Sequence, residues 1–194
     1  MNFYISWAKA ILAPALSLLI SAPAHAQSPP ISSTSTSAAK ALPPPCSAAE
    51  NRQFDFWIGD WDVTTPNGKL VGTNLIKPIL RSCVLDETWI ADGGFTGKSY
   101  TSYDAPRKVW HHTFVDEAGH TLLLDGKFEN GKMTMSDHEV ARKPDRNAIN
   151  EITWTPNLDG SVHQYWRASA DGGKTWQLVF DGKYVKSNRP QPKR

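Results

Sequence analysis

The sequence predicts an all-β protein: a closed antiparallel up-and-down β-barrel of about ten strands, with one short helix before it. Turn sequences rich in Gly, Asn and Asp recur at short intervals after residue 61, and no helical periodicity lies between them. Several segments alternate apolar and polar residues, as half-buried strands do. A single open sheet of so many strands would expose long edges, and closure into a barrel removes them.

Residues 1–26 have the features of a secretory signal peptide. Lys9 lies ahead of an apolar run at 11–20, and the sequence AHA at 24–26 is a typical cleavage site. The apolar run is shorter than the roughly 20 residues that span a bilayer, so we expect no membrane anchor after cleavage. The expected location of the protein is the periplasm or the extracellular space.

Residues 27–45 are rich in Ser, Thr, Ala and Pro, and we expect a disordered linker because they cannot bury enough apolar surface to fold. The barrel domain is then expected at 46–188, followed by a basic tail at 189–194. The formal net charge of the chain is +2, and acidic and basic residues are interspersed. Because this pattern offers no basic surface for a phosphate backbone, nucleic acid is not an expected partner.

The chain has two cysteines, Cys46 and Cys83. In an exported protein an even pair predicts one disulfide, and the spacing does not fit a C-x-x-C redox site. The bond would close a loop of about 37 residues, which corresponds to roughly 4 kcal/mol of stabilisation in the chain-entropy estimate.

One short helix is expected before the barrel. Ser47 and Glu50 form a capping-box pattern, and the helix should run for one to three turns and end near Gly59. The Asn-Gly dipeptides at 67–68 and 130–131 predict two type I′ hairpin turns. Ten strands are expected, at residues 61–65, 70–80, 83–91, 95–104, 107–115, 120–128, 131–138, 147–156, 161–169 and 175–186.

Alternation within the strands predicts which side chains share a face. Leu85, Glu87 and Trp89 share one face of the third strand, together with Cys83. Several strands carry apolar residues on both faces, which predicts either a lined cavity or a surface for a homodimer. In the last strand, the side chains expected to share a face are Trp176, Leu178, Phe180 and Tyr184.

Residues 54–63 read FDFWIGDWDV, with three aromatics followed by a G-x-W sequence. With Gly59 at the end of a helix and Trp61 at the start of a strand, the chain resembles the calycin superfamily, whose lipocalins carry G-x-W at this place. It is more closely similar to a family of exported bacterial domains of unknown function with the signature FDFWxGxWDV. The similarity extends over residues 46–185, through Cys83-Leu85-Glu87-Trp89, Trp110-Thr113-Val115-Asp116 and Trp154-Thr155-Pro156.

The resemblance implies a lipocalin-like barrel and no particular activity. It implies structural roles for Trp57, Gly59 and Trp61, with the two tryptophans closing the floor of the barrel. Typical lipocalins pack an Arg of the last strand on the Trp of G-x-W, whereas the last strand here offers Lys183 and Lys186.

The sequence Ser169-x-Asp171-x-Gly173-x-Thr175-Trp176 matches the Asp-box pattern of sialidase propellers. A propeller needs several copies and this chain has one, so the pattern predicts a hairpin rather than sialidase chemistry. We expect Asp171 to accept hydrogen bonds from turn amides and Trp176 to pack on the hairpin.

No sequence pattern of a metal centre, a cofactor site or a nucleophilic catalyst is present, so none is assigned. His111 and His112 are neighbours on a strand, so their side chains should point to opposite faces. Glu87 is the most suggestive carboxylate, because it would be buried if its face points inward. The alternative for Glu87 is an internal ion pair with an arginine: Arg81, Arg107, Arg142 or Arg167.

These observations favour an exported barrel that binds a small apolar or amphipathic molecule. Two alternatives stay open: a barrel enzyme that uses Glu87 or His112 as acid or base, and an envelope interaction module that dimerises through its outer face. The candidate ligand contacts are the polar and aromatic side chains expected on inward faces: Glu87, Trp89, Tyr103, Trp110, His112, Phe114, Gln164 and Trp166.

Overall fold

The structure is a computed structural model that describes residues 43–138, 140 and 145–189. The expected signal peptide lies outside the described residues, as do 27–42 of the expected linker and 190–194 of the expected tail. Within the described part of the chain, no helix is long and apolar enough to cross a membrane.

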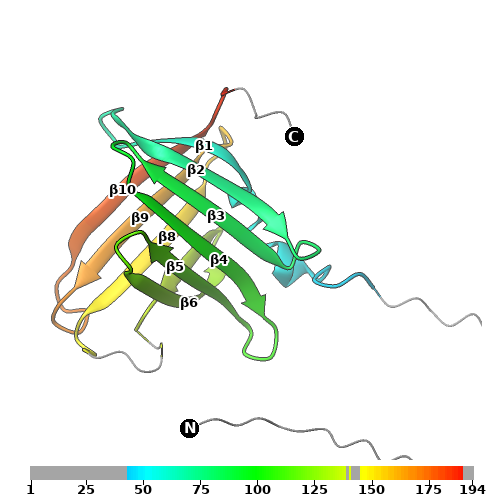
Figure 1. Cartoon of the computed structure of the whole chain (residues 1–194). Helices are drawn as coiled ribbons and strands as arrows, with labels where there is room; N and C mark the ends of the chain where they lie inside the picture. The colour runs from blue at the N-terminus through cyan, green and yellow to red at the C-terminus, as the bar shows by residue number, and fades with distance from the viewer. Residues whose placement is uncertain (1–42, 139, 141–144, 190–194) are drawn as a thin grey trace, which may run out of the picture. The chain divides into compact units, whose positions relative to one another are not determined.

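The described chain forms a closed barrel of ten antiparallel strands (Figure 1). Each strand pairs with the next strand in sequence, and β1 pairs with β10 to close the ring, which confirms the expected fold. The strands are β1 (Gly59–Thr64), β2 (Leu70–Ile79), β3 (Val84–Ala91), β4 (Thr96–Asp104), β5 (Val109–Asp116), β6 (Thr121–Glu129), β7 (Lys132–Ser136), β8 (Ile149–Pro156), β9 (Val162–Ser169) and β10 (Gln177–Lys186).

The short helical segment expected before the barrel consists of two 3-10 turns, η1 (Ala49–Arg52) and η2 (Asp55–Trp57). The expected capping box is not formed, because η1 begins one residue later than expected, after Ala48, and no side chain caps its first turn. The two turns place Phe54 and Trp57 inside the barrel, where both are buried.

The disulfide between Cys46 and Cys83 is present and ties the residues before η1 to the turn between β2 and β3. That turn has a rare backbone conformation, because residues 80–82 are not glycines and all have positive φ angles, from 49° to 65°. Arg52 of η1 donates a hydrogen bond to the carbonyl oxygen of Ser82. The disulfide and this hydrogen bond therefore hold the helical segment against the same turn.

An aromatic cluster joins the helical segment to the strands. The ring of Phe54 stacks on Trp57 with centroids 5.0 Å apart and meets the edge of Trp110 at 5.8 Å. Trp57 also lies 5.5 Å from Trp154, and the indole N–H of Trp61 donates to the Trp57 carbonyl oxygen at 2.9 Å. These buried rings fill one part of the interior with apolar surface.

Lys186 of β10 lies over the indole ring of Trp61, with Nζ 3.7 Å from the ring centroid. The same nitrogen donates a hydrogen bond to the Ile58 carbonyl oxygen at 2.7 Å. A Cβ at position 59 would lie 2.1 Å from Nζ, so any residue larger than Gly59 would displace the ammonium group. Of the two lysines considered for packing on Trp61, Lys186 and not Lys183 contacts its ring.

A bulge in β10 changes the faces expected for its side chains. The register of β10 against β9 shifts between Leu178 and Phe180, so Val179 is an extra residue. Leu178 consequently lies on the outside with 57% of its surface exposed, whereas Phe180 and Tyr184 point inward. The expectation that these side chains share one face with Trp176 is wrong, because period-2 alternation does not hold across a bulge.

The two Asn-Gly turns differ. Asn130 and Gly131 both have positive φ, as a type I′ turn requires, and they join β6 to β7. In the turn between β1 and β2 only Gly68 has a positive φ, and its amide donates to the Thr65 carbonyl oxygen. The expected type I′ turn at 67–68 is wrong, because the pairing of β1 with β2 shifts register beside this loop.

Asp171 organises the turn between β9 and β10. Its carboxylate accepts hydrogen bonds from the Lys174 and Thr175 amides at 3.0 and 2.9 Å and from the Thr175 hydroxyl at 2.6 Å. These bonds, with the Thr175 hydroxyl as the largest contributor, lower the pKa of Asp171 to about 2. The indole N–H of Trp176 donates to the Gly173 carbonyl oxygen at 3.0 Å, so the single Asp-box forms a hairpin turn.

We predict that the Cys46→Ser, Cys83→Ser double variant loses about 4 kcal/mol of unfolding free energy, because the bond closes a loop with a sequence separation of 37. Urea unfolding followed by tryptophan fluorescence measures the loss. A reductant should destabilise the wild type and leave the double variant unchanged. A double variant as stable as the oxidised wild type would contradict a stabilising role for the bond.

We predict that Lys186→Met lowers the unfolding free energy by about 1 kcal/mol, because it removes the cation–π contact with Trp61 and the hydrogen bond to Ile58. Lys183→Met is the matched control, since Lys183 lies on the same strand and, among the described residues, its side chain pairs only with exposed Asp159. Chemical denaturation compares the two variants. Equal losses of unfolding free energy in both variants would show that the contact with Trp61 does not stabilise the fold.

Candidate functional site

A cavity of about 200 Å³ lies inside the barrel and is lined by side chains of β3, β5, β6, β8, β9 and β10. Its inner part is formed by fully buried side chains, among them His112, Trp154 and Tyr184. Trp89 and Phe114 in the same lining are only half-buried, so the cavity opens to solvent on their side. The interior therefore has a closed part and an open part.

Two strand glycines make room for aromatic rings in the cavity wall. A Cβ added at Gly97 would lie 2.2 Å from the ring of Phe114, and one at Gly72 would lie 2.5 Å from Trp89. Each ring therefore lies close against the backbone of a neighbouring strand. The glycine positions thus decide where the aromatic wall can lie.

Glu87 belongs to a buried polar cluster at the inner part of the cavity. Asn74 Nδ2 donates to Glu87 Oε1 at 2.6 Å, and Ser99 Oγ donates to Glu87 Oε2 at 2.5 Å. The Tyr184 hydroxyl donates to Gln164 Oε1 and lies 3.5 Å from Asn74 Nδ2. Burial raises the pKa of Glu87, and the hydrogen bonds from Ser99 and Asn74 offset part of this rise. Burial likewise raises the pKa of Tyr184.

His112 lies in the same cavity, and its side chain forms one hydrogen bond with a described residue, between Nδ1 and the Thr101 hydroxyl at 2.7 Å. Thr101 is fully buried and its hydroxyl has no other partner in the described part of the chain, so we assign the hydroxyl as the donor. The proton of the neutral imidazole is then on Nε2. Burial, with a smaller effect of neighbouring His111, lowers the pKa of His112 to about 3, so the ring is neutral near pH 7.

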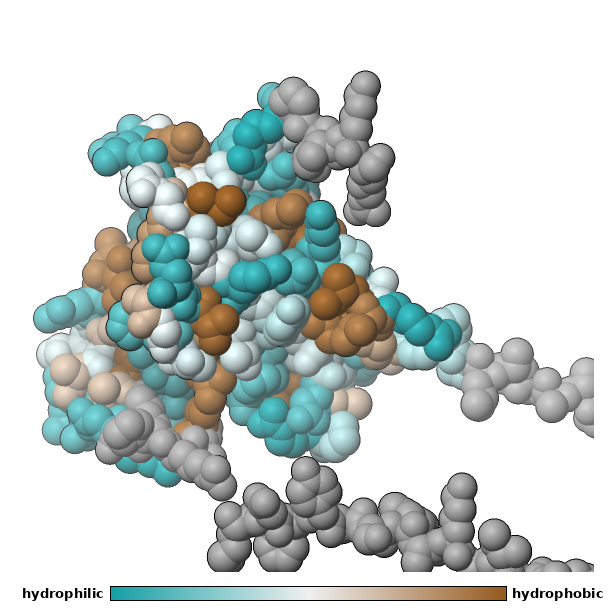
Figure 2. All heavy atoms as spheres, viewed as in Figure 1, coloured by the Kyte–Doolittle hydropathy of each residue, from teal (hydrophilic) through white to brown (hydrophobic). Residues whose placement is uncertain are grey.

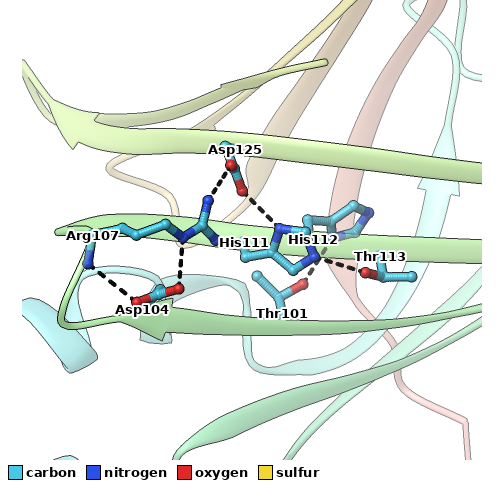
Figure 3. A network of polar contacts seen from close by, with 7 residues as sticks. All are labelled: Thr101, Asp104, Arg107, His111, His112, Thr113 and Asp125. Atoms are coloured by element: carbon cyan, nitrogen blue, oxygen red, sulfur yellow. Dashed lines mark hydrogen bonds and ion pairs between the residues drawn. The ribbon is translucent and has the colours of Figure 1, made fainter. Parts of the chain in front are cut away.

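His111, next to His112 on β5, belongs to a different network on the outer wall (Figure 3). Its Nδ1 lies 2.7 Å from Asp125 Oδ1, and its Nε2 lies 3.0 Å from Thr113 Oγ1. Arg107 donates to the other oxygen of Asp125 at 2.5 Å. The two histidines therefore have separate partners on opposite faces of the strand, as adjacent strand positions require.

No arginine in the described part of the chain pairs with Glu87, so the internal ion pair considered above is not formed there. Arg107 and Arg167 bind carboxylates on the outer wall instead. Arg81 lies in the turn between β2 and β3, and Arg142 lies outside the described residues. Neutral donors take the place of a cation around Glu87.

The structure brings most of the candidate contact residues to the cavity. Tyr103 and Trp110 do not line it: Trp110 packs on Phe54, and its indole N–H donates to Gln53 at 3.2 Å, while Tyr103 packs on Trp110. The candidates that line the cavity are Glu87, Trp89, His112, Phe114, Gln164 and Trp166.

Half of the lining residues are not among the candidate ligand contacts. Trp154 carries a signal in the W-T-P sequence, and alternation predicts a shared strand face for Phe180 and Tyr184. The others are ordinary apolar residues with no distinguishing sequence pattern. The added lining residues are Leu122, Ile152, Trp154, Val179, Phe180 and Tyr184.

The chemistry of the lining suits hydrogen bonding rather than metal coordination. The ionisable side chains facing the cavity are one carboxylic acid, one imidazole and one phenol. Among the described residues, no group of three or more His, Cys, Asp or Glu side chains is arranged to hold a metal ion. The cavity can therefore bind a ligand through apolar contact and a few hydrogen bonds.

No protein-family model and no curated protein matches the chain. The resemblance carried by the FDFWxGxWDV motif stays a prediction. Function is therefore inferred from the cavity and from the side chains around it.

We predict that His112 makes the folded protein less stable in acid. Its ring takes up a proton near the ordinary pKa of 6.5 in the unfolded chain and stays neutral down to about pH 3 in the folded protein. The stabilising contribution is thus complete above pH 6.5 and is lost as the pH falls toward 3, by roughly 1 kcal/mol per pH unit.

Urea unfolding of the wild type and of His112→Asn between about pH 7 and about pH 5 measures this contribution. The difference in unfolding free energy between the two proteins should shrink as the pH falls, since the variant lacks the titrating ring. Carboxylates elsewhere titrate in both proteins and cancel in the comparison. A difference that stays constant over this range would contradict a buried neutral imidazole.

Proposed function

We propose that this protein is an exported β-barrel that binds a compact apolar or amphipathic molecule in its cavity. The observation that carries the proposal is that the side chains lining the cavity change from aromatic at its open part to polar at its inner part. Aromatic side chains form the open part, and the inner part contains the buried polar side chains of Glu87, His112 and Gln164. Ligand sites in proteins commonly combine apolar walls with a few placed polar groups.

The size of the cavity limits the ligand. Its volume of about 200 Å³ is below the roughly 300–1,000 Å³ of pockets for drug-sized molecules. A compact molecule, or the end of a longer chain that enters through the open part, fits this space. A large rigid cofactor does not.

Two features support export. Residues 1–26 have the pattern of a signal peptide, and disulfides such as Cys46–Cys83 persist mainly in oxidising compartments. The ligand would then be met in the periplasm or outside the cell.

The enzyme alternative is weaker than the binding proposal. Glu87 and His112 do line one cavity, which an acid–base pair would require. However, a ring with a pKa of about 3 is a poor proton acceptor near neutral pH, and both Glu87 oxygens already accept hydrogen bonds. This arrangement orients and holds a ligand better than it transfers a proton.

The alternative of an envelope module that dimerises through its outer face has little support on the face shown in Figure 2. Exposed apolar side chains do occur there on neighbouring strands, for example Val115 of β5 and Leu123 of β6. Figure 2 shows that the apolar patches on this face are small and divided by polar residues. Interfaces between copies usually need a larger continuous apolar area.

We predict that Leu122→Trp blocks ligand binding, because it places a larger ring where half-buried Leu122 lines the cavity. Purified protein is incubated with a small-molecule extract of the producing cells and examined by native mass spectrometry. The wild type should retain a small-molecule mass, and the variant should retain about ten-fold less or none.

Leu123→Trp is the matched control, because it adds the same ring one residue away on the outer wall, where Leu123 is 37% exposed. It should retain as much ligand as the wild type. Thermal unfolding checks that both variants are folded. Equal retention by Leu122→Trp and the wild type, or no retention by the wild type, would refute the proposal.

A further inference from the structure

The acceptor atoms of the polar cluster are already used by donors of the protein itself. Glu87 accepts from Asn74 through Oε1 and from Ser99 through Oε2, at 2.6 and 2.5 Å. Gln164 accepts from the Tyr184 hydroxyl through Oε1. Asn74 Oδ1 has no partner among the described residues, but it is sealed off and cannot meet a ligand. The protein therefore offers a ligand few free acceptors at this place.

Two donors at the inner part of the cavity have no partner among the described residues. With Nδ1 accepting from Thr101, His112 carries its proton on Nε2, and no described residue accepts it. The amide nitrogen of Gln164 donates to no described residue either. The two side chains are only 3% and 9% exposed and line the cavity, and neither nitrogen is among the sealed-off polar atoms. The cavity thus presents two buried donors to whatever enters it.

The charges around the cavity argue against an ionised head group. The lining contains no Lys or Arg, so a buried carboxylate or phosphate would lack a counter-charge. Burial keeps His112 neutral near pH 7, so it does not supply one. A cationic head group would meet the N–H donors of His112 and Gln164, which repel it. Glu87 is the one acid of the lining, and its two oxygens already accept hydrogen bonds from Asn74 and Ser99.

We propose that the inner part of the cavity binds the uncharged carbonyl oxygen of an apolar ligand through hydrogen bonds from His112 Nε2–H and the Gln164 side-chain amide. Ketones, aldehydes, esters and amides supply such an acceptor without carrying charge. Half-buried Trp89, Phe114 and Trp166 contact the apolar remainder of the ligand. This proposal rests on the proposed function, because it names the ligand class for the same cavity.

Three probe series with matched alkyl chains test the head group: straight-chain 2-ketones, the corresponding carboxylates and the corresponding alkylammonium ions. Isothermal titration calorimetry near pH 7 measures their affinities for the purified wild-type protein. The ketones should bind at least about ten-fold more tightly than either charged series, because burial of an unpaired charge is costly.

Two conservative variants remove one donor each. His112→Asn keeps an acceptor for Thr101 but lacks Nε2, and Gln164→Glu keeps an oxygen for Tyr184 but lacks the amide N–H. Each should weaken ketone binding by about ten-fold, as expected when a buried acceptor loses its donor. His111→Asn, on the outer face of the same strand, is the control and should leave the affinity unchanged.

A second measurement does not depend on the folding of any variant. A ketone labelled with carbon-13 at the carbonyl is bound to the wild type and examined by NMR. Hydrogen bonds from two donors should move the carbonyl signal downfield of its position in a hydrocarbon solvent. An unchanged carbonyl position would overturn the proposal.

The outcomes separate the head group from the cavity. Tighter binding of a charged series that Leu122→Trp abolishes would overturn the carbonyl proposal and leave ligand binding in the cavity intact. Ketone binding that neither donor variant weakens would also overturn it. If no probe of any series binds the wild type, both the carbonyl proposal and the proposed function fail.

Discussion

Pairing of β1 with β10 is the contact on which the rest of the barrel depends. It sets Trp61 opposite Lys186 and Val63 opposite Tyr184, and it closes the ring of strands. Closure removes the free sheet edges and gives each strand one inner and one outer face. The ammonium group over the Trp61 ring and the inward Tyr184 hydroxyl are consequences of the same register.

The closed interior is divided between apolar packing and a ligand-sized space. Rings of Phe54 and Trp57 from the helical segment fill one part, and the Cys46–Cys83 bond ties that segment to the barrel wall. Glu87 and its polar neighbours line the inner part of the cavity, and the cavity opens to solvent on the side of Trp89 and Phe114. Because buried polar groups are costly without partners, the cluster is held by its own hydrogen bonds, with unused donors at the cavity surface.

Features that depend on residues close together in the chain could be predicted from the sequence, whereas features that depend on contacts between strands could not. Turn chemistry and alternation were enough to predict about ten strands and the strand faces that Glu87 and His112 share with aromatic residues, because both depend on residues close together in the chain. The bulge at Val179 and the full set of residues in the cavity wall could not be predicted. The bulge depends on how β10 pairs with β9, and the cavity wall combines six strands that meet only in the closed barrel.

By itself, the sequence determined that this chain forms a barrel, that its two cysteines can pair, and that an acid lies among apolar residues of the third strand. Only the tertiary structure decided that Glu87 is held by the neutral donors Asn74 and Ser99 rather than by an arginine. It also decided that Gln164 and His112 present unused donors to one cavity. Local patterns report the face of each side chain, whereas its partners are set by cross-strand register, which exists only once the ring has closed.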